Sequence, residues 1–150
     1  MKTTKLKGVH LFLILSFSLC STLLFSQEKS VQERLMSKEW MLDATEARPH
    51  AVGLSFAEKE FLFSIIIGEN RSSMPVPYYL SDSIETQFDN SKIGQITHGK
   101  YIVYSYSGEK NDSFFINEIL ELTDIFLKCK DIKGGKGEIQ ILRGVPKENK

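Results

Sequence analysis

The chain has 150 residues, with 19 basic and 19 acidic side chains, 41% hydrophobic residues and 11% aromatic residues. This composition is typical of one folded domain and is too apolar for a disordered chain. The balanced charge excludes a strongly basic nucleic-acid-binding surface, and two cysteines exclude a scaffold held together by many disulfides.

Residues 1–26 have the pattern of a secretory signal peptide. Three lysines lie within the first seven residues, and an uncharged apolar run then extends from Leu11 to Phe25. This run is short for a membrane-spanning helix, which needs roughly 20 apolar residues. Ser26 places a small residue just before Gln27, where signal peptidase could cut. We therefore expect export to the periplasm or the extracellular medium, and a mature domain of residues 27–150.

Two alternatives remain open for the N-terminal segment: an uncleaved membrane anchor, and a lipid anchor on Cys20. Leu19 stands directly before Cys20, where a lipobox prefers a small residue. Removing 26 of the 150 residues leaves 124, with 16 basic and 19 acidic side chains and a net charge of −3. Cys129 is then the sole cysteine. We expect it to be buried in phase with Ile125 and Leu127, or else paired with another chain.

The mature domain shows the pattern of an all-β protein, because short segments rich in Ile, Phe, Tyr and Val alternate with turn residues. Residues 27–38 are expected to form a short helix or an ordered lead-in. A polar loop is expected over 68–73, and Pro75 and Pro77 indicate an edge-like or irregular strand after it. The turn at Gly134-Gly135 suits a hairpin. The expected strands are 39–46, 52–56, 61–67, 76–80, 83–88, 92–97, 100–107, 113–122, 125–130 and 137–144.

Segments of this length fit a single antiparallel up-and-down β-barrel of about eight strands, in which closure also hides the sheet edges. Period-2 alternation then assigns the residues that face the lumen. The lumen candidates are Phe61, Phe63, Ile65, Phe114, Ile116, Glu118 and Leu120. Glu118 is the one charged residue among them; it would either orient a ligand or be hydrated near the barrel mouth.

Several segments, taken in order, resemble the small bacterial lipocalin-like domains, which are relatives of the calycin barrels. They are Ser37–Leu42 with Trp40, then 54–56, 79–84, and 116–122 followed by Asp124 and Leu127. Calycins usually have Gly two residues before this Trp, whereas this chain has Lys38. The resemblance implies a basic residue of the last strand over Trp40. Arg143 is the candidate for such a structural pair at the barrel end, and the alternative is that Arg143 is simply solvated.

The sequence contains no motif for catalysis or for metal binding. His50 and His98 lie far apart, and there is no Cys-x-x-Cys, His-Glu-x-x-His or Gly-x-Ser-x-Gly pattern. We therefore predict no enzymatic activity, no cofactor, no nucleic-acid partner and no membrane association after cleavage. Two functions remain: a barrel that binds a small hydrophobic molecule in its lumen, or a barrel with a packed interior that acts as a protein-interaction, inhibitor or envelope accessory module.

Overall fold

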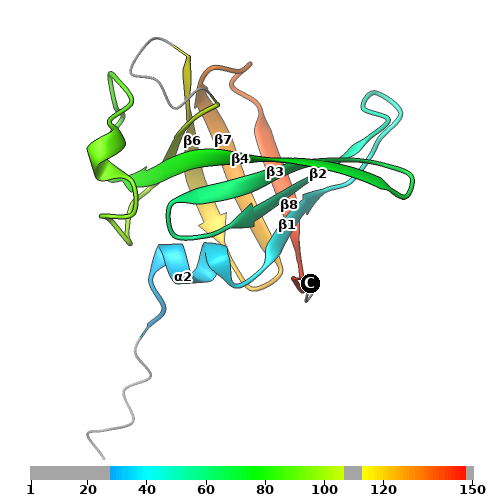
Figure 1. The fold of residues 1–150 in the computed structure, drawn as a ribbon, viewed down its shortest axis with the longest axis horizontal. Helices are drawn as coiled ribbons and strands as arrows, with labels where there is room; N and C mark the ends of the chain where they lie inside the picture. The colour runs from blue at the N-terminus through cyan, green and yellow to red at the C-terminus, as the bar shows by residue number, and fades with distance from the viewer. Residues whose placement is uncertain (1–27, 107–112, 148–150) are drawn as a thin grey trace, which may run out of the picture.

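The computed structural model describes residues 28–106 and 113–147, so the expected signal peptide and Cys20 lie outside the described residues. Eight antiparallel strands form one sheet, in which each strand pairs with the next along the chain and β1 pairs with β8 to close a barrel (Figure 1). This confirms the all-β prediction. The strands are β1 (Glu39–Leu42), β2 (Ala51–Phe56), β3 (Glu60–Ile67), β4 (Asn70–Ser81), β5 (Tyr101–Ser105), β6 (Phe114–Leu122), β7 (Phe126–Lys133) and β8 (Ile139–Val145).

The helix α2 (Val31–Met36) lies at one end of the barrel, as Figure 1 shows. It begins with a capping box, in which Ser30 and Glu33 each bond the backbone N–H of the other. Leu35 is fully buried in the barrel core, and its carbonyl oxygen accepts a 2.8 Å hydrogen bond from the Trp40 indole. The short helix expected here is therefore confirmed, and α2 with Trp40 fills this end of the barrel.

The hairpin of β3 and β4 corrects the expected loop over 68–73. Only Gly68 and Glu69 form the turn, because residues 70–73 pair with β3, and Gly68 adopts φ of 59°. Pro75 and Pro77 lie where β4 pairs with β3 alone, since β5 pairs only with residues 78–81 of β4. The prolines therefore interrupt no hydrogen bonds on a second side, which fits the edge-like strand that was expected there.

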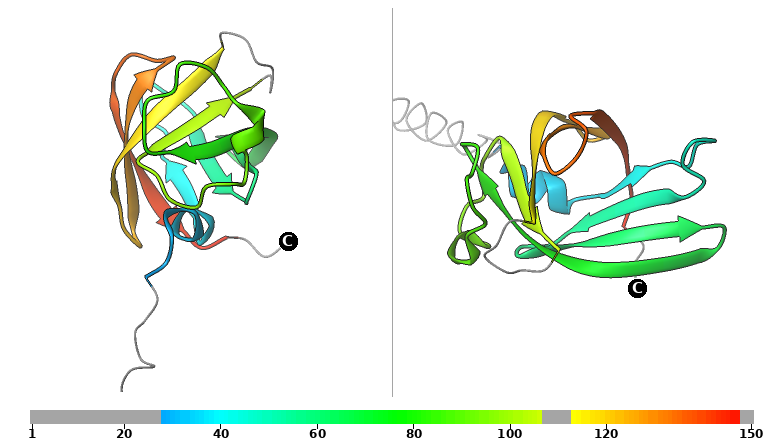
Figure 2. Two further views of the ribbon diagram at one scale, coloured as in Figure 1. Left: turned by 90° about the vertical axis from the view of Figure 1, so that its left-hand side faces the viewer. Right: turned by 90° about the horizontal axis from the view of Figure 1, so that it is seen from above.

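Residues 82–100 contain no strand, so the strands expected over 83–88 and 92–97 are wrong. This segment is irregular apart from the 3₁₀ helix η1 (Asn90–Lys92), and it lies against the outside of the barrel (Figure 2). Its Phe88 is 2% exposed and packs on Tyr79 with 5.3 Å between ring centroids. Phe88 joins a second hydrophobic core, here called the outer core: Tyr79, Phe88, Val103, Phe114 and Ile116.

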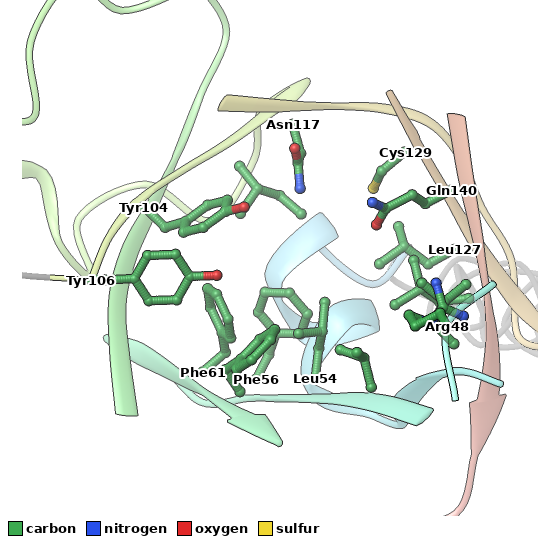
Figure 3. A pocket seen from close by; sticks show the side chains of 15 residues that line it. Arg48, Leu54, Phe56, Phe61, Tyr104, Tyr106, Asn117, Leu127, Cys129 and Gln140 are labelled. Atoms are coloured by element: carbon green, nitrogen blue, oxygen red, sulfur yellow. The ribbon is translucent and has the colours of Figure 1, made fainter. Parts of the chain in front are cut away.

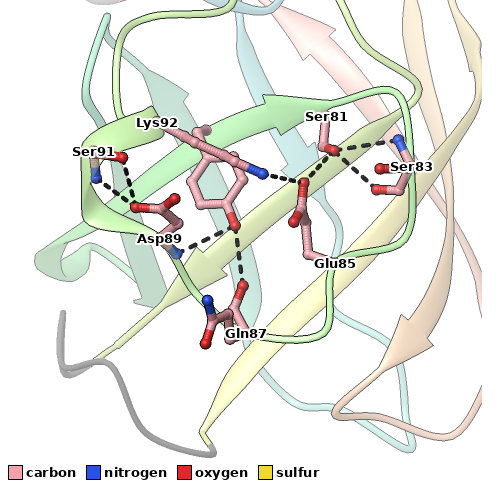
Figure 4. Close-up of polar contacts among 8 residues, drawn as sticks. Ser81, Ser83, Glu85, Gln87, Asp89, Ser91 and Lys92 are labelled. Atoms are coloured by element: carbon pink, nitrogen blue, oxygen red, sulfur yellow. Dashed lines mark hydrogen bonds and ion pairs between the residues drawn. The ribbon is translucent and has the colours of Figure 1, made fainter.

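Polar contacts fasten this segment to β4 (Figure 4). The Tyr79 hydroxyl accepts from the Asp89 backbone N–H and donates to the Gln87 carbonyl, both at 3.4 Å, and burial raises the Tyr79 pKa to about 12. Glu85 accepts from Ser81 Oγ at 2.6 Å and pairs with Lys92 Nζ at 2.8 Å. Burial opposes the charge on Glu85, but these two contacts outweigh it and lower the Glu85 pKa. The outer core is thus closed by a specific polar network.

Candidate ligand-binding site

The barrel encloses a cavity of about 260 Å³, shown in Figure 3. Its walls come from every strand except β4, together with the loop between β1 and β2. Side chains alternate along each strand, so only every second residue reaches the cavity. The apolar lining residues are Leu42, Val52, Leu54, Phe56, Phe61, Phe63, Ile102, Leu127 and Leu142.

Aromatic side chains dominate the part of the cavity nearest α2. Phe56 and Phe61 pair directly across the β2–β3 hairpin, and their ring centroids lie 5.2 Å apart. Gln32 of α2 donates a hydrogen bond to the Glu58 carbonyl in the turn of this hairpin, which fixes the helix beside it. Phe61 also contacts Tyr104 edge to face at 5.4 Å. These rings form a rigid apolar floor.

Polar groups line the remainder of the cavity: Arg48, Tyr104, Tyr106, Asn117 and Gln140. In Figure 3, the hydroxyl groups of Tyr104 and Tyr106 point into the cavity. Tyr104 stacks on Phe115 at 5.2 Å and forms a side-chain hydrogen bond with Asn117. Burial raises the pKa of both phenols, so each is neutral near pH 7 and able to donate a hydrogen bond.

Arg48 is the one charged side chain among the lining residues. It belongs to the loop between β1 and β2, where its Nε donates to the His50 carbonyl at 3.2 Å and one Nη donates to the Asp43 carbonyl. Both contacts are to backbone oxygens. None of the four ion pairs found among the described residues includes Arg48. Within the part of the chain that the structure describes, the Arg48 guanidinium therefore has no carboxylate partner, and it borders a largely apolar cavity.

Cys129 also lines the cavity, and its predicted burial is confirmed. Burial raises the pKa of its thiol to about 12, so the thiol is protonated at neutral pH. Leu127 is buried beside it as expected. Ile125, expected on the same face, is 68% exposed because it lies in the turn before β7 begins at Phe126.

Two of the three lumen candidates on β3 border the cavity, and none of the four on β6 does. Phe61 and Phe63 line the cavity, but Ile65 is 38% exposed and lies further along the β3–β4 hairpin. Phe114 and Ile116 belong to the outer core, on the other side of the sheet. The side chain of Asn117, between Ile116 and Glu118 in β6, is the one that reaches the cavity.

Glu118 and Leu120 share this correction. Glu118 forms an ion pair with Lys100 at 2.6 Å and is not among the lining residues, and Leu120 is 41% exposed. The pairing of β6 with β7 shifts register between Ile116 and Asn117 and again between Ile119 and Glu121. Because of these irregularities, Leu122 belongs to the hydrophobic core inside the barrel, here called the inner core, although strict alternation from Ile116 would place both side chains on the same face.

The predicted barrel-end pair of Trp40 and Arg143 is also wrong. Trp40 is fully buried, but Arg143 is exposed and pairs with Asp43 at 3.0 Å. Gly144 is the residue of β8 that meets the indole: it lies opposite Trp40, and a Cβ added to it would be 3.2 Å from Trp40 Cζ3. In β8 it is therefore Gln140 and Leu142 that face inward, while Ile139 and Ile141 are exposed.

None of the five polar lining residues was predicted from the sequence: Arg48, Tyr104, Tyr106, Asn117 and Gln140. Tyr104 could have been found from Ile102, since both lie on one face of β5. Arg48 lies in a loop, where no alternation indicates direction.

Comparison of the chain with protein-family models, with curated proteins and with solved structures found no match. Within residues 28–106 and 113–147, no group of three or more His, Cys, Asp and Glu side chains is placed to hold a metal ion. No helix in the same ranges is long and apolar enough to cross a membrane. The cavity is therefore the feature from which a function can be argued.

Proposed function

We propose that this protein is a lipocalin-like barrel that binds a small hydrophobic ligand in its lumen and has no enzymatic activity. The observation that carries the proposal is the cavity of about 260 Å³ with its mainly apolar wall. That volume equals roughly nine water molecules at ~30 Å³ each. Enclosed apolar cavities favour apolar ligands over water, because few wall atoms offer hydrogen bonds.

The alternative, a barrel with a packed interior that acts as a protein-interaction module, would need side chains to fill this space. Phe56, Phe61 and Leu127 are well buried, yet they still border the cavity. The open space therefore favours ligand binding over the alternative.

We propose further that the protein is exported, on the charged start and short apolar run of residues 1–26. N-terminal sequencing of the mature protein is expected to begin at Gln27. Retention of Lys2 would contradict cleavage, and a lipid-modified Cys20 at the N-terminus would show anchoring instead.

Ligand binding can be tested with octanol on protein purified after expression of the full chain. Trp40 is the single tryptophan and lies in the inner core with Leu127 and Leu142, which border the cavity. Its emission is expected to change saturably as octanol is added, and calorimetry should give the same dissociation constant.

A pair of matched variants tests whether octanol binds in the cavity. Leu54→Phe replaces the isobutyl group of a lining residue with a larger phenyl ring, which reduces the cavity volume and should weaken octanol binding at least tenfold. Leu62→Phe makes the same change on β3, at an exposed residue outside the cavity lining, and should leave binding unchanged. Absence of saturable binding by linear alcohols of six to ten carbons and by octanoate, in a protein that remains folded, would refute the proposal and favour the packed-interior module.

A further inference from the structure

We propose that the cavity selects an amphiphile with an anionic head group, which Arg48 binds while the apolar chain lies against Phe56 and Phe61. This inference rests on the proposed ligand binding and adds the chemical class of the ligand. The shared chemistry is a short hydrocarbon chain joined to a carboxylate or a similar anion.

The charged Arg48 lies far along the barrel from the rings of Phe56 and Phe61. Phe56 ends β2 and pairs with Phe61, the second residue of β3, beside the turn that α2 contacts. Arg48 precedes the opposite end of β2 at Ala51. The apolar floor and the guanidinium thus border opposite ends of one strand. A ligand that fills the cavity would have an apolar part at one end and a group able to accept hydrogen bonds at the other.

Arg48 has more hydrogen-bond donors than its two protein contacts use. A guanidinium has five N–H donors, and the contacts to the Asp43 and His50 carbonyls use two of them. Those contacts fix the orientation of the group without neutralising it. A carboxylate could then accept from the remaining donors, and such charge-assisted hydrogen bonds are stronger than neutral ones.

The acidic groups near the cavity also favour Arg48 as the position of an anionic head group. Asp43 offers Arg48 only its backbone carbonyl, because its carboxylate pairs with Arg143. Asp131 lies opposite Asn117 in the sheet and its charge acts on Tyr104, which disfavours a second anion at that side. An anionic head group is therefore expected at Arg48 and not beside Tyr104.

The size of the cavity limits the chain length. The cavity volume of about 260 Å³ equals that of roughly nine water molecules. Because a methylene group is of similar size to a water molecule, this space suits an eight-carbon chain better than a long-chain lipid. Octanoate, octyl sulfate, octanol and octylamine share this chain and differ only in the head group. Their comparison separates the contribution of the charge from that of the hydrocarbon.

The test measures the dissociation constants of these four compounds by calorimetry, with Trp40 emission as a second readout. Octanoate is expected to bind at least tenfold more tightly than octanol, and octylamine more weakly than octanol. If octyl sulfate and octanoate both bind more tightly than octanol, negative charge is sufficient. If only octanoate does, the geometry of the carboxylate is also required. Either result supports the inference.

Three variants locate the charge. Arg48→Gln should weaken octanoate binding about tenfold or more and leave octanol binding unchanged, whereas Arg48→Lys should retain part of the preference. Lys136→Gln is the matched control: it removes one positive charge from an exposed turn residue that does not line the cavity, and it should change neither constant more than twofold.

The outcomes separate the two proposals. If octanol binds but octanoate binds no better, or octylamine equals octanoate, the anionic class is wrong and the binding function stands. If Arg48→Gln remains folded and the preference persists, the assignment to Arg48 is wrong. If none of the four compounds binds, both proposals fall. The comparison of compounds on the unaltered protein decides the charge preference even if a variant fails to fold.

Discussion

The two faces of β4, β5 and β6 differ in how completely they are filled. Outside the barrel, Tyr79, Val103, Phe114 and Ile116 are covered by Phe88 and the polar network of residues 82–92, and all five side chains of this outer core are 4% exposed or less. Inside, Ile102 and Tyr104 border a cavity of about 260 Å³. The same strands therefore contribute side chains to a fully packed core on one face and to the cavity wall on the other. Stability is expected to depend on the outer face and binding on the inner one.

The largest effect on this comparison is expected from Phe88→Ala. Removing a ring from a fully packed site should lower the free energy of unfolding by about 3–5 kcal/mol. Phe63→Ala is the matched change at the cavity, where part of the surroundings is already empty, and should cost less than half as much. Urea denaturation of both variants measures the difference. Equal losses would show that the two faces are packed alike.

Cys129→Ala tests the inner face with a smaller change. The thiol is buried but borders the cavity, so its removal should cost about 1 kcal/mol at pH 7 and leave octanol binding nearly unchanged. Denaturation at neutral pH gives the first quantity and calorimetry the second. Rapid reaction of Cys129 with a thiol reagent in the folded protein would contradict its burial.

The same variant should respond differently to alkaline pH. The thiol pKa is raised from 9.0 to about 12 in the folded state, so below pH 9 its contribution to stability is fully present. Above pH 9 only the unfolded thiol ionises, and the free energy of unfolding falls by up to about 1.4 kcal/mol per pH unit until the folded pKa is reached. The advantage of the native protein over Cys129→Ala should therefore shrink or reverse near pH 10.5. A constant difference from pH 7 to 10.5 would refute the raised pKa.

The smallest effect is expected from Arg143→Ala. The ion pair with Asp43 is exposed, and such pairs contribute little, so the loss should stay within about 0.5 kcal/mol. Trp40 emission should not change, because Gly144 and not Arg143 meets the indole. A shift in that emission would indicate that Arg143 contacts Trp40 after all.

The comparison also explains which features the sequence could predict. Alternation in β3 was informative because the side chains of Phe61 and Phe63 face the cavity, while Leu62 between them is exposed. Alternation in β6 was misleading because Phe114 and Ile116 are as buried as lumen residues, only on the other face. Periodicity shows that two faces differ, but not which one is enclosed.

The remaining errors arose from contacts between distant parts of the chain. Residues 82–100 contain apolar side chains at spacings that suit strands, yet Phe88 is used to cover a sheet already formed by β4 to β6. Arg48 reaches the cavity through a loop held by the Asp43 and His50 carbonyls. The sequence around Phe88 and around Arg48 does not indicate either placement. Each depends on where the closed sheet positions the ends of the connecting segment.

The seam between β1 and β8 has a consequence for how the chain folds. Its register joins Glu39 to Val145, Trp40 to Gly144 and Met41 to Arg143, so each partner is more than 100 positions away in the sequence. Loop-closure entropy makes such distant contacts slow to form. β1 therefore has one unpaired edge until β8, the last strand of the barrel, is available to pair with it. The pairing of β1 with β8 is thus expected to complete the barrel last, and chaperones that shield an open strand edge would act before that step.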